Sequence, residues 1–168
     1  MTLTDLSPPP VGAVSLDAAK TFLRIDTDAE DALIGDLIDT AALHIEDRCA
    51  LSLITRPQRL RRPVRGGAVR LHRYPVMSIE SVSLDEASID TQANLRARPV
   101  TVTVPHPGVV QIDFTAGFGA DPANIPTPLR QALLLLVAHF YEHRGDDGAP
   151  PIPMMVDALI APYRGMRL

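Results

Sequence analysis

The chain has one cysteine among its 168 residues, no tryptophan and only seven other aromatic residues. A single thiol, Cys49, excludes an internal disulfide framework and disfavours a cysteine-rich metal site. Its place on the apolar side of a helical pattern predicts an ordinary buried thiol. No apolar run approaches the roughly 20 residues that a membrane-spanning helix needs, and the N-terminus lacks the features of a signal peptide. We therefore expect a protein that works inside a cell, or in a particle assembled there, with no membrane partner.

Charge is unevenly distributed along the chain. The net charge of −4 hides −7 over residues 1–55, +5 over residues 56–98 and −2 over residues 99–168. Regions of opposite charge in one small protein favour contacts in which the negative surface of one copy meets the positive surface of the next, because complementary charges steer association and fix its register. Scattered, solvated surface charge is the alternative interpretation.

Arginine dominates the positive segment, and lysine is almost absent from the chain. The planar guanidinium suits phosphate and carboxylate alike, so this segment is predicted to touch DNA or an acidic neighbouring subunit. It lacks the interleaved aromatic residues of single-strand binders, which argues against a dedicated nucleic-acid-binding module. The arginines are Arg56, Arg59, Arg61, Arg62, Arg65, Arg70 and Arg73.

Residues 15–50 carry two helical patterns, after a proline-rich stretch that predicts an extended arm over residues 1–14. Ser15 is a suitable cap for a helix that ends near Leu23, and a longer helix is expected from Asp26–Asp28 to about Ala50. The longer helix has a polar face made of Asp36, Asp39, Thr40, Glu46 and Asp47. Its apolar stripe consists of Leu33, Ile34, Leu37, Ile38, Ala41, Ala42, Ile45 and Cys49.

Residues 55–118 are rich in β-branched residues, proline and glycine, which predicts a small antiparallel β region inserted between helices. The turn at residues 105–108 is predicted to join two strands in a hairpin. Alternation along the second strand places Val110, Ile112 and Phe114 on one face. A tight exit from the sheet is predicted at Gly117, in a Gly-Phe-Gly sequence. The expected strands cover residues 58–62, 69–71, 79–84, 100–104 and 109–115.

Residues 127–144 form a third predicted helix, with Thr127 as its cap and Pro128 in its first turn. This helix is apolar around most of its circumference, so part of its surface is expected to meet another protein. A proline-rich linker follows from residue 146, and a short helix is expected from Met154 to about Tyr163. The fold class is therefore α+β: a mainly helical core of three to four helices, with residues 15–145 as a single domain and residues 146–168 as a linker and docking segment.

The sequence HFYEH at residues 139–143 matches the His-x-x-Glu-His order of inverted zinc metallopeptidases. Two histidines one helical turn apart can hold one metal ion, and the acid between them can polarise a water molecule. A small zinc hydrolase using His139, Glu142 and His143 is thus an alternative function. Nothing else in the chain supports hydrolysis, so we favour histidines of a helix surface or an interface, and no cofactor or catalytic residue.

Several short segments follow one another along the chain in an order that is typical of a known family. They are SLDAAK at residues 15–20, FLRI at 22–25, DALIGDLI at 31–38, RYPV at 73–76, TAGFG at 115–119, PTPLRQALLLLVAHFYEHRG at 126–145 and LIAPYR at 159–164. This arrangement resembles the phage head-tail connector family, the gp6-like adaptor proteins of long-tailed phages and gene transfer agents. Residues 83–104 match no pattern of that family.

The resemblance implies a non-enzymatic assembly protein at the head-tail junction of a virion or phage-like particle. It implies a homo-oligomeric ring, a dodecamer, that lies below the portal protein, continues the DNA channel and receives a stopper or tail-terminator protein. In such a ring some of the arginines would face the channel. The resemblance also implies a C-terminal segment that docks onto the portal, through Met154, Met155, Leu159, Ile160, Tyr163, Arg164 and Arg167.

Overall fold

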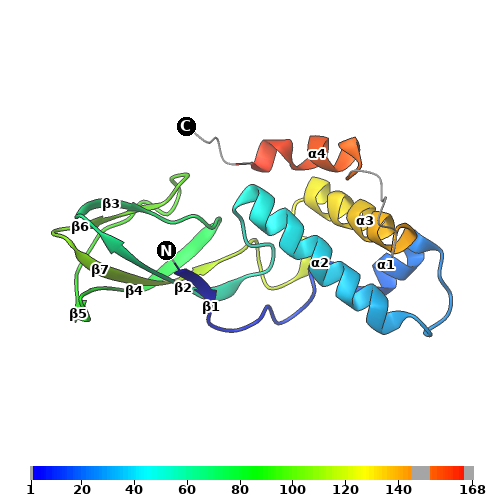
Figure 1. The fold of residues 1–168 in the computed structure, drawn as a ribbon, viewed down its shortest axis with the longest axis horizontal. Coiled ribbons are helices and arrows are strands. Elements are labelled where there is room, and N and C mark those ends of the chain that lie inside the picture. The colour runs from blue at the N-terminus through cyan, green and yellow to red at the C-terminus, as the bar shows by residue number, and fades with distance from the viewer. Residues whose placement is uncertain (1, 145–151, 165–168) are drawn as a thin grey trace. The chain divides into compact units, whose positions relative to one another are not determined.

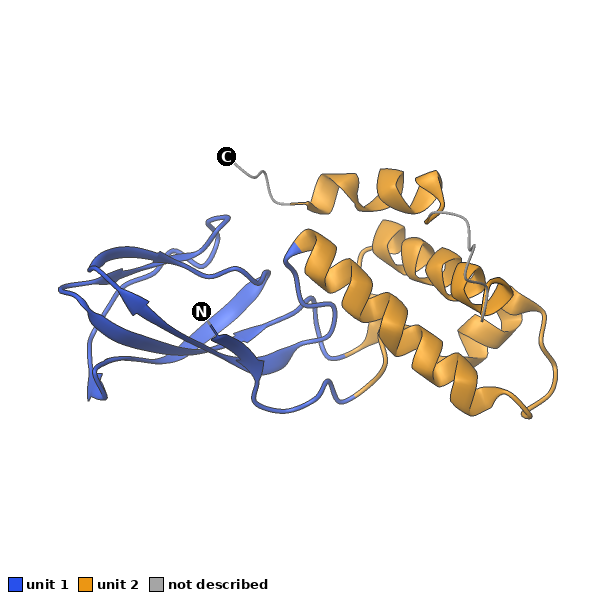
Figure 2. Ribbon diagram, in the orientation of Figure 1, with its two compact units in different colours: residues 1–10, 50–120 blue, residues 11–49, 121–168 orange. Residues whose placement is uncertain are grey.

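The computed structural model describes residues 2–144 and 152–164 and has the predicted α+β composition. The chain divides into two compact units (Figure 2). Residues 1–10 and 50–120 form a β unit, and residues 11–49 and 121–168 form a helical unit. The β unit is thus an insertion between helices that also recruits the start of the chain.

The helical unit contains α1 (Leu16–Leu23), α2 (Asp31–Cys49), α3 (Thr127–Glu142) and α4 (Met154–Ile160) (Figure 1). Helices α1 and α4 both contact α3, which also contacts α2. Among the described residues, no helix combines the length and apolar character that crossing a bilayer requires. The core between these helices is formed by Ala19, Ile34, Ile38, Ala41, Ile45, Leu129, Ala132, Leu133, Leu136, Val137, Val156 and Ile160.

The helix ends differ in part from the sequence prediction. The cap at Ser15 is confirmed, because its hydroxyl accepts a hydrogen bond from the backbone N–H of Ala18 at 3.2 Å. The second helix begins at Asp31, not at residues 26–28. The ammonium of Lys20 binds the carboxylates of both Asp28 and Asp31, at 2.6 and 2.7 Å, and so ties the preceding loop to α1. Thr127 is the first residue of α3 and makes no capping bond.

The β unit has a five-stranded antiparallel sheet and a two-stranded one. The large sheet has the order β1-β2-β7-β4-β5, and the small sheet pairs β3 with β6. The strands are β1 (Thr2–Asp5), β2 (Arg56–Val64), β3 (Gly67–Arg70), β4 (Val76–Leu84), β5 (Ala87–Ser88), β6 (Thr101–Val104) and β7 (Gly108–Ala116). Part of the predicted N-terminal arm is therefore an edge strand, with Leu3 opposite Leu60.

The predicted hairpin across residues 105–108 is wrong. Both edges of β7 are occupied, by β2 on one side and β4 on the other, so β6 has no edge of β7 to pair with. Instead β6 pairs with β3, and Val102 lies opposite Val69 with both side chains buried. The turn thus carries the chain from one sheet to the other. The two sheets share one hydrophobic core, which includes Leu60, Leu71, Val82, Val104 and Phe114.

The alternation predicted for β7 is confirmed, since Val110, Ile112 and Phe114 are all buried. The residue that follows β7, Gly117, is closely packed against neighbouring backbone. Gly117 has φ of +145°, and its N–H donates to the carbonyl of Pro75 at 2.9 Å. A Cβ at this position would lie 2.3 Å from the Cα of Thr55, so only glycine fits without moving the backbone.

Candidate interaction surfaces

Three of the seven arginines in the positive segment bind within their own unit. Arg56 is buried, and its Nε donates to the carboxylate of Asp5 at 2.7 Å. Arg59 forms two parallel hydrogen bonds of 2.7 Å with Asp113, and this fork holds the pKa of Asp113 below its usual range. A guanidinium N–H of Arg73 donates to the carbonyl of Leu51 at 3.0 Å. These three arginines hold the β unit together.

The other four arginines are available for contacts with a partner. In the part of the chain that the structure describes, the side chains of Arg61, Arg62, Arg65 and Arg70 form no hydrogen bond or ion pair. Arg61, Arg65 and Arg70 are exposed, and Arg62 is half-buried. All four lie on ten consecutive residues, from the end of β2 through the turn into β3. We call this stretch, residues 61–70, the arginine segment.

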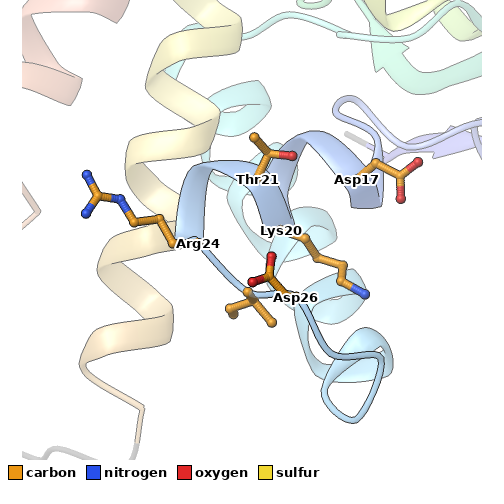
Figure 3. Close-up of a pocket in the computed structure, with 6 residues that line it drawn as sticks. Asp17, Lys20, Thr21, Arg24 and Asp26 are labelled. Carbon is orange, nitrogen blue, oxygen red and sulfur yellow. The ribbon is translucent and has the colours of Figure 1, made fainter.

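Residues of mixed charge at the N-terminal end of the helical unit line an open hollow of about 530 Å³ (Figure 3). Asp17 and Arg24 lie at opposite ends of α1, with Lys20 between them. The ammonium of Lys20 is already held by two carboxylates, which raise its pKa, so it is a structural cation here. The hollow is lined by charged residues together with Thr21 and Ile25, and it is open to solvent.

A second charged network joins α2 to the C-terminal end of α3. Glu30 accepts hydrogen bonds from the hydroxyl of Tyr141 and from Arg144, the latter at 2.6 Å. These two donors lower the pKa of Glu30, and the guanidinium of Arg144 also lies over the ring of Tyr141, 4.5 Å from its centroid. The network ties the C-terminal end of α3 to the loop that precedes α2.

Helix α4 presents two exposed methionines and buries two aliphatic residues. Met154 is 88% exposed and Met155 60%, whereas Val156 and Ile160 are fully buried. Asp157 receives hydrogen bonds from Arg164 and Arg48, which outweigh its desolvation and lower its pKa. Of the remaining predicted docking residues, Leu159, Tyr163 and Arg164 are half-buried, and Arg167 lies outside the described residues.

Two titratable side chains of α2, Cys49 and His44, lie near the Asp157 ion pairs. The thiol of Cys49 is buried and reaches the carbonyl of Ile160 at 3.9 Å, and burial raises its pKa. The Nε2 atom of His44 is buried without a hydrogen-bond partner. Burial, together with the charge of Arg48, lowers the pKa of His44, so the folded helix favours the neutral ring.

The histidines of the His-x-x-Glu-His motif are packed against each other. The ring centroids of His139 and His143 are 4.7 Å apart, and Nδ1 of His143 lies 2.8 Å from the carbonyl oxygen of His139. His139 is buried, whereas Glu142 is exposed. Among the described residues, no three histidine, cysteine or acidic side chains are grouped so that they could hold a metal ion. The arrangement is that of a packed helix end.

On α2 the sequence prediction missed one exposed residue and placed one buried residue on the polar face. Leu43 is 58% exposed and lies one helical turn from Asp39 and two from Asp36, both also exposed. The spacing 36, 39, 43 places all three on one side of the helix. Glu46, which the pattern assigns to the polar face, is only 4% exposed. Leu43 was detectable as the single large apolar residue opposite the buried stripe.

Comparisons with known proteins match this architecture over its whole length. The family described as "Phage gp6-like head-tail connector protein" matches residues 13–97. A chain from the neck of an empty GTA particle, computed with C6 symmetry, is 30% identical with a TM-score of 0.84. A chain from the virion of a native gene transfer agent (GTA) particle is 30% identical with a TM-score of 0.83. A chain from the neck of a native GTA particle, computed with C12 symmetry, is 32% identical with a TM-score of 0.78.

Each of these three matches covers 100% of this chain and 97% of the other. No curated protein sequence matches the chain significantly.

Proposed function

This chain belongs to the phage gp6-like head-tail connector family, and we propose that it acts as a structural adaptor in the neck of a phage-like particle. The observation that carries the proposal is the end-to-end match, at 30% identity, with chains from gene transfer agent necks. A match that covers all of this chain and 97% of the other supports a shared role and not merely a shared fold.

In this proposal identical copies form a closed ring beneath the portal protein, most simply a dodecamer. The C6 and C12 symmetries of the two related necks support such a ring. The ring continues the channel through which DNA passes, and its lower side receives a stopper or tail-terminator protein. Charged residues of the arginine segment are then at a subunit boundary or at the channel.

Helix α4 is the proposed attachment to the portal. Met154 and Met155 offer flexible apolar side chains that adapt to a partner surface, and Leu159, Tyr163, Arg164 and Arg167 follow them in the sequence of the proposed docking segment. Val156 and Ile160 anchor the helix to its own unit, which holds the methionines in place. Docking of many copies at once makes weak individual contacts act together.

The test is replacement of both exposed methionines, Met154→Asp with Met155→Asp, in a strain that makes the particles. Because both side chains are exposed, folding should be unaffected, whereas heads should no longer carry tails in negative-stain electron micrographs. Met77→Asp is the matched control, since Met77 is also exposed, at 55%, but lies on β4. Normal tailed particles with the double variant would reject the docking role.

These substitutions are a cleaner test than truncation after Ala149. Truncation also removes the fully buried side chains of Val156 and Ile160 and so uncovers the apolar surfaces of α2 and α3. A defect after truncation would then mix lost docking with lost stability.

A further inference from the structure

The two units carry net charges of opposite sign, positive in the β unit and negative in the helical unit. The β unit contains nine basic and six acidic residues, and the helical unit contains seven basic and fourteen acidic residues. Their net charges are therefore +3 and −7. Within each unit most opposite charges that come close are already bonded, such as Arg59 with Asp113 and Lys20 with Asp31. The remaining charges are thus mainly arginines on one unit and carboxylates on the other.

Two unpaired carboxylates on α2 lie on the same side of the helix as an exposed apolar residue. Asp36 and Asp39 are exposed and, among the described residues, form no ion pair. Ala32, Asp36, Asp39 and Leu43 recur at helical spacing on the side opposite the buried stripe, and Leu43 is the C-terminal residue of this set. We call these four residues the acidic face. Exposed apolar surface beside polar groups is a common composition of a protein interface.

We infer that the acidic face of one copy binds the arginine segment of the neighbouring copy in the ring. This inference rests on the proposed ring and assigns its subunit contact. Complementary charge identifies the partner as a second copy, because the acidic face would repel DNA, whereas the four free guanidinium groups of the arginine segment carry the opposite charge. Guanidinium groups bind carboxylates by two parallel hydrogen bonds, and arginine side-chain stems cover apolar surface such as that of Leu43.

A contact of this kind is heterologous, because each copy uses one surface toward one neighbour and the other surface toward the next. Repetition of a heterologous contact closes into a ring when the rotation permits. Every copy carries both surfaces, so a single type of contact accounts for the whole ring. The ion pairs of Arg59 with Asp113 and of Arg56 with Asp5 fix the first half of β2, from which the arginine segment continues. The free guanidinium groups are therefore attached to a well-anchored backbone.

Charge reversal with complementation tests the assignment. One variant carries Asp36→Arg with Asp39→Arg, and the other carries Arg61→Glu with Arg65→Glu. Each is expressed alone in a particle-producing strain that lacks the natural gene, and tailed heads are counted by negative-stain electron microscopy. Repulsion at every subunit contact should lower the fraction of tailed heads about tenfold or more in each case.

Co-expression of the two variants should restore tailed heads. Copies can then alternate around the ring, because the reversed acidic face of one variant meets the reversed arginine segment of the other, and their unaltered surfaces also match. A chain with all four substitutions should assemble for the same reason. Failure of both rescues, or normal assembly by either variant alone, would overturn the inference. Thermal unfolding of the purified variants confirms that each folds, and the rescue itself requires folded chains.

Two single reversals elsewhere, Glu142→Arg and Arg96→Glu, are the controls, since both residues are exposed and lie outside the two surfaces. They should leave assembly unchanged. If the Arg61→Glu, Arg65→Glu variant forms normal tailed particles that fail to deliver DNA, the segment lines the channel and the subunit assignment is wrong. A different result would reject the proposed function itself: absence of the unaltered chain from the neck of purified particles.

Discussion

Replacing Gly117 with alanine should destabilise the β unit strongly. The residue has φ of +145°, which L-amino acids with a side chain rarely adopt. An added Cβ would lie 2.3 Å from the Cα and 2.4 Å from the N of Thr55, so it would meet backbone and not a flexible side chain. The segment after β7 and the segment before β2 must therefore separate.

The magnitude follows from what that separation disrupts. The strained backbone conformation costs about 1–3 kcal/mol for a residue other than glycine. Moving the two segments apart also weakens two hydrogen bonds, from the N–H of Thr55 to the carbonyl of Gly119 at 2.9 Å and from the N–H of Phe118 to the carbonyl of Leu53 at 3.2 Å. Each contributes about 1 kcal/mol. We expect a loss of about 3–5 kcal/mol, a large share of the roughly 5–15 kcal/mol that stabilises a typical domain.

Gly67→Ala is the matched control. Gly67 also has positive φ, +83°, but a Cβ there would have nothing within 4 Å, so only the backbone strain of about 1–2 kcal/mol remains. Urea unfolding gives both free energies, and hydrogen exchange followed by mass spectrometry shows whether residues 50–120 lose protection first. A cost for Gly117→Ala that equals the cost for Gly67→Ala would refute the close-approach argument.

Two further predictions concern pH. Arg59 lowers the pKa of Asp113 below its ordinary value of 3.8, so the pair stabilises the fold fully above about pH 4, and this stabilisation disappears as the pH falls through the folded-state pKa. Asp113→Asn should therefore reduce the free energy of unfolding by about 1 kcal/mol at pH 7. In strong acid, urea unfolding should give the same free energy for the variant and the unaltered protein. Burial lowers the pKa of His44 below 6.5, so the unfolded chain takes up a proton that the folded chain does not, and stability should fall as the pH drops below about 6.5. His44→Gln should reduce that fall between pH 7.5 and 5.5 in urea midpoints, and an unchanged pH dependence would show that His44 is not responsible.

Local patterns predicted the helices and the strand faces well. The periodic apolar residues of α2, such as Ile34, Ile38 and Ile45, are buried as the 3.6-residue repeat requires, and alternation along β7 placed Phe114 in the core. Both patterns depend only on neighbours in the sequence. The same holds for Ser15, whose capping partner is three residues away.

Strand pairing and strand edges were not predictable in this way. A turn between β6 and β7 indicates a hairpin on local grounds, but the edges of β7 were filled by β2 and β4 from elsewhere in the chain. Similarly, β1 is recruited from the predicted arm because the outer edge of β2 is open to it. Competition for hydrogen-bonding edges is settled only among all strands together.

The sequence by itself determined the family of this protein, the amphipathic character of α2 and the excess of arginine in the β unit, since these depend on residue identity and spacing. Only the tertiary structure decided which of those arginines are free. Arg56 and Arg59 find their carboxylates on β1 and β7, more than 50 residues away in the chain, whereas Arg61 and Arg65 find none among the described residues. Pairing of charges depends on distance in space, and spatial proximity between distant segments exists only once the sheet has formed.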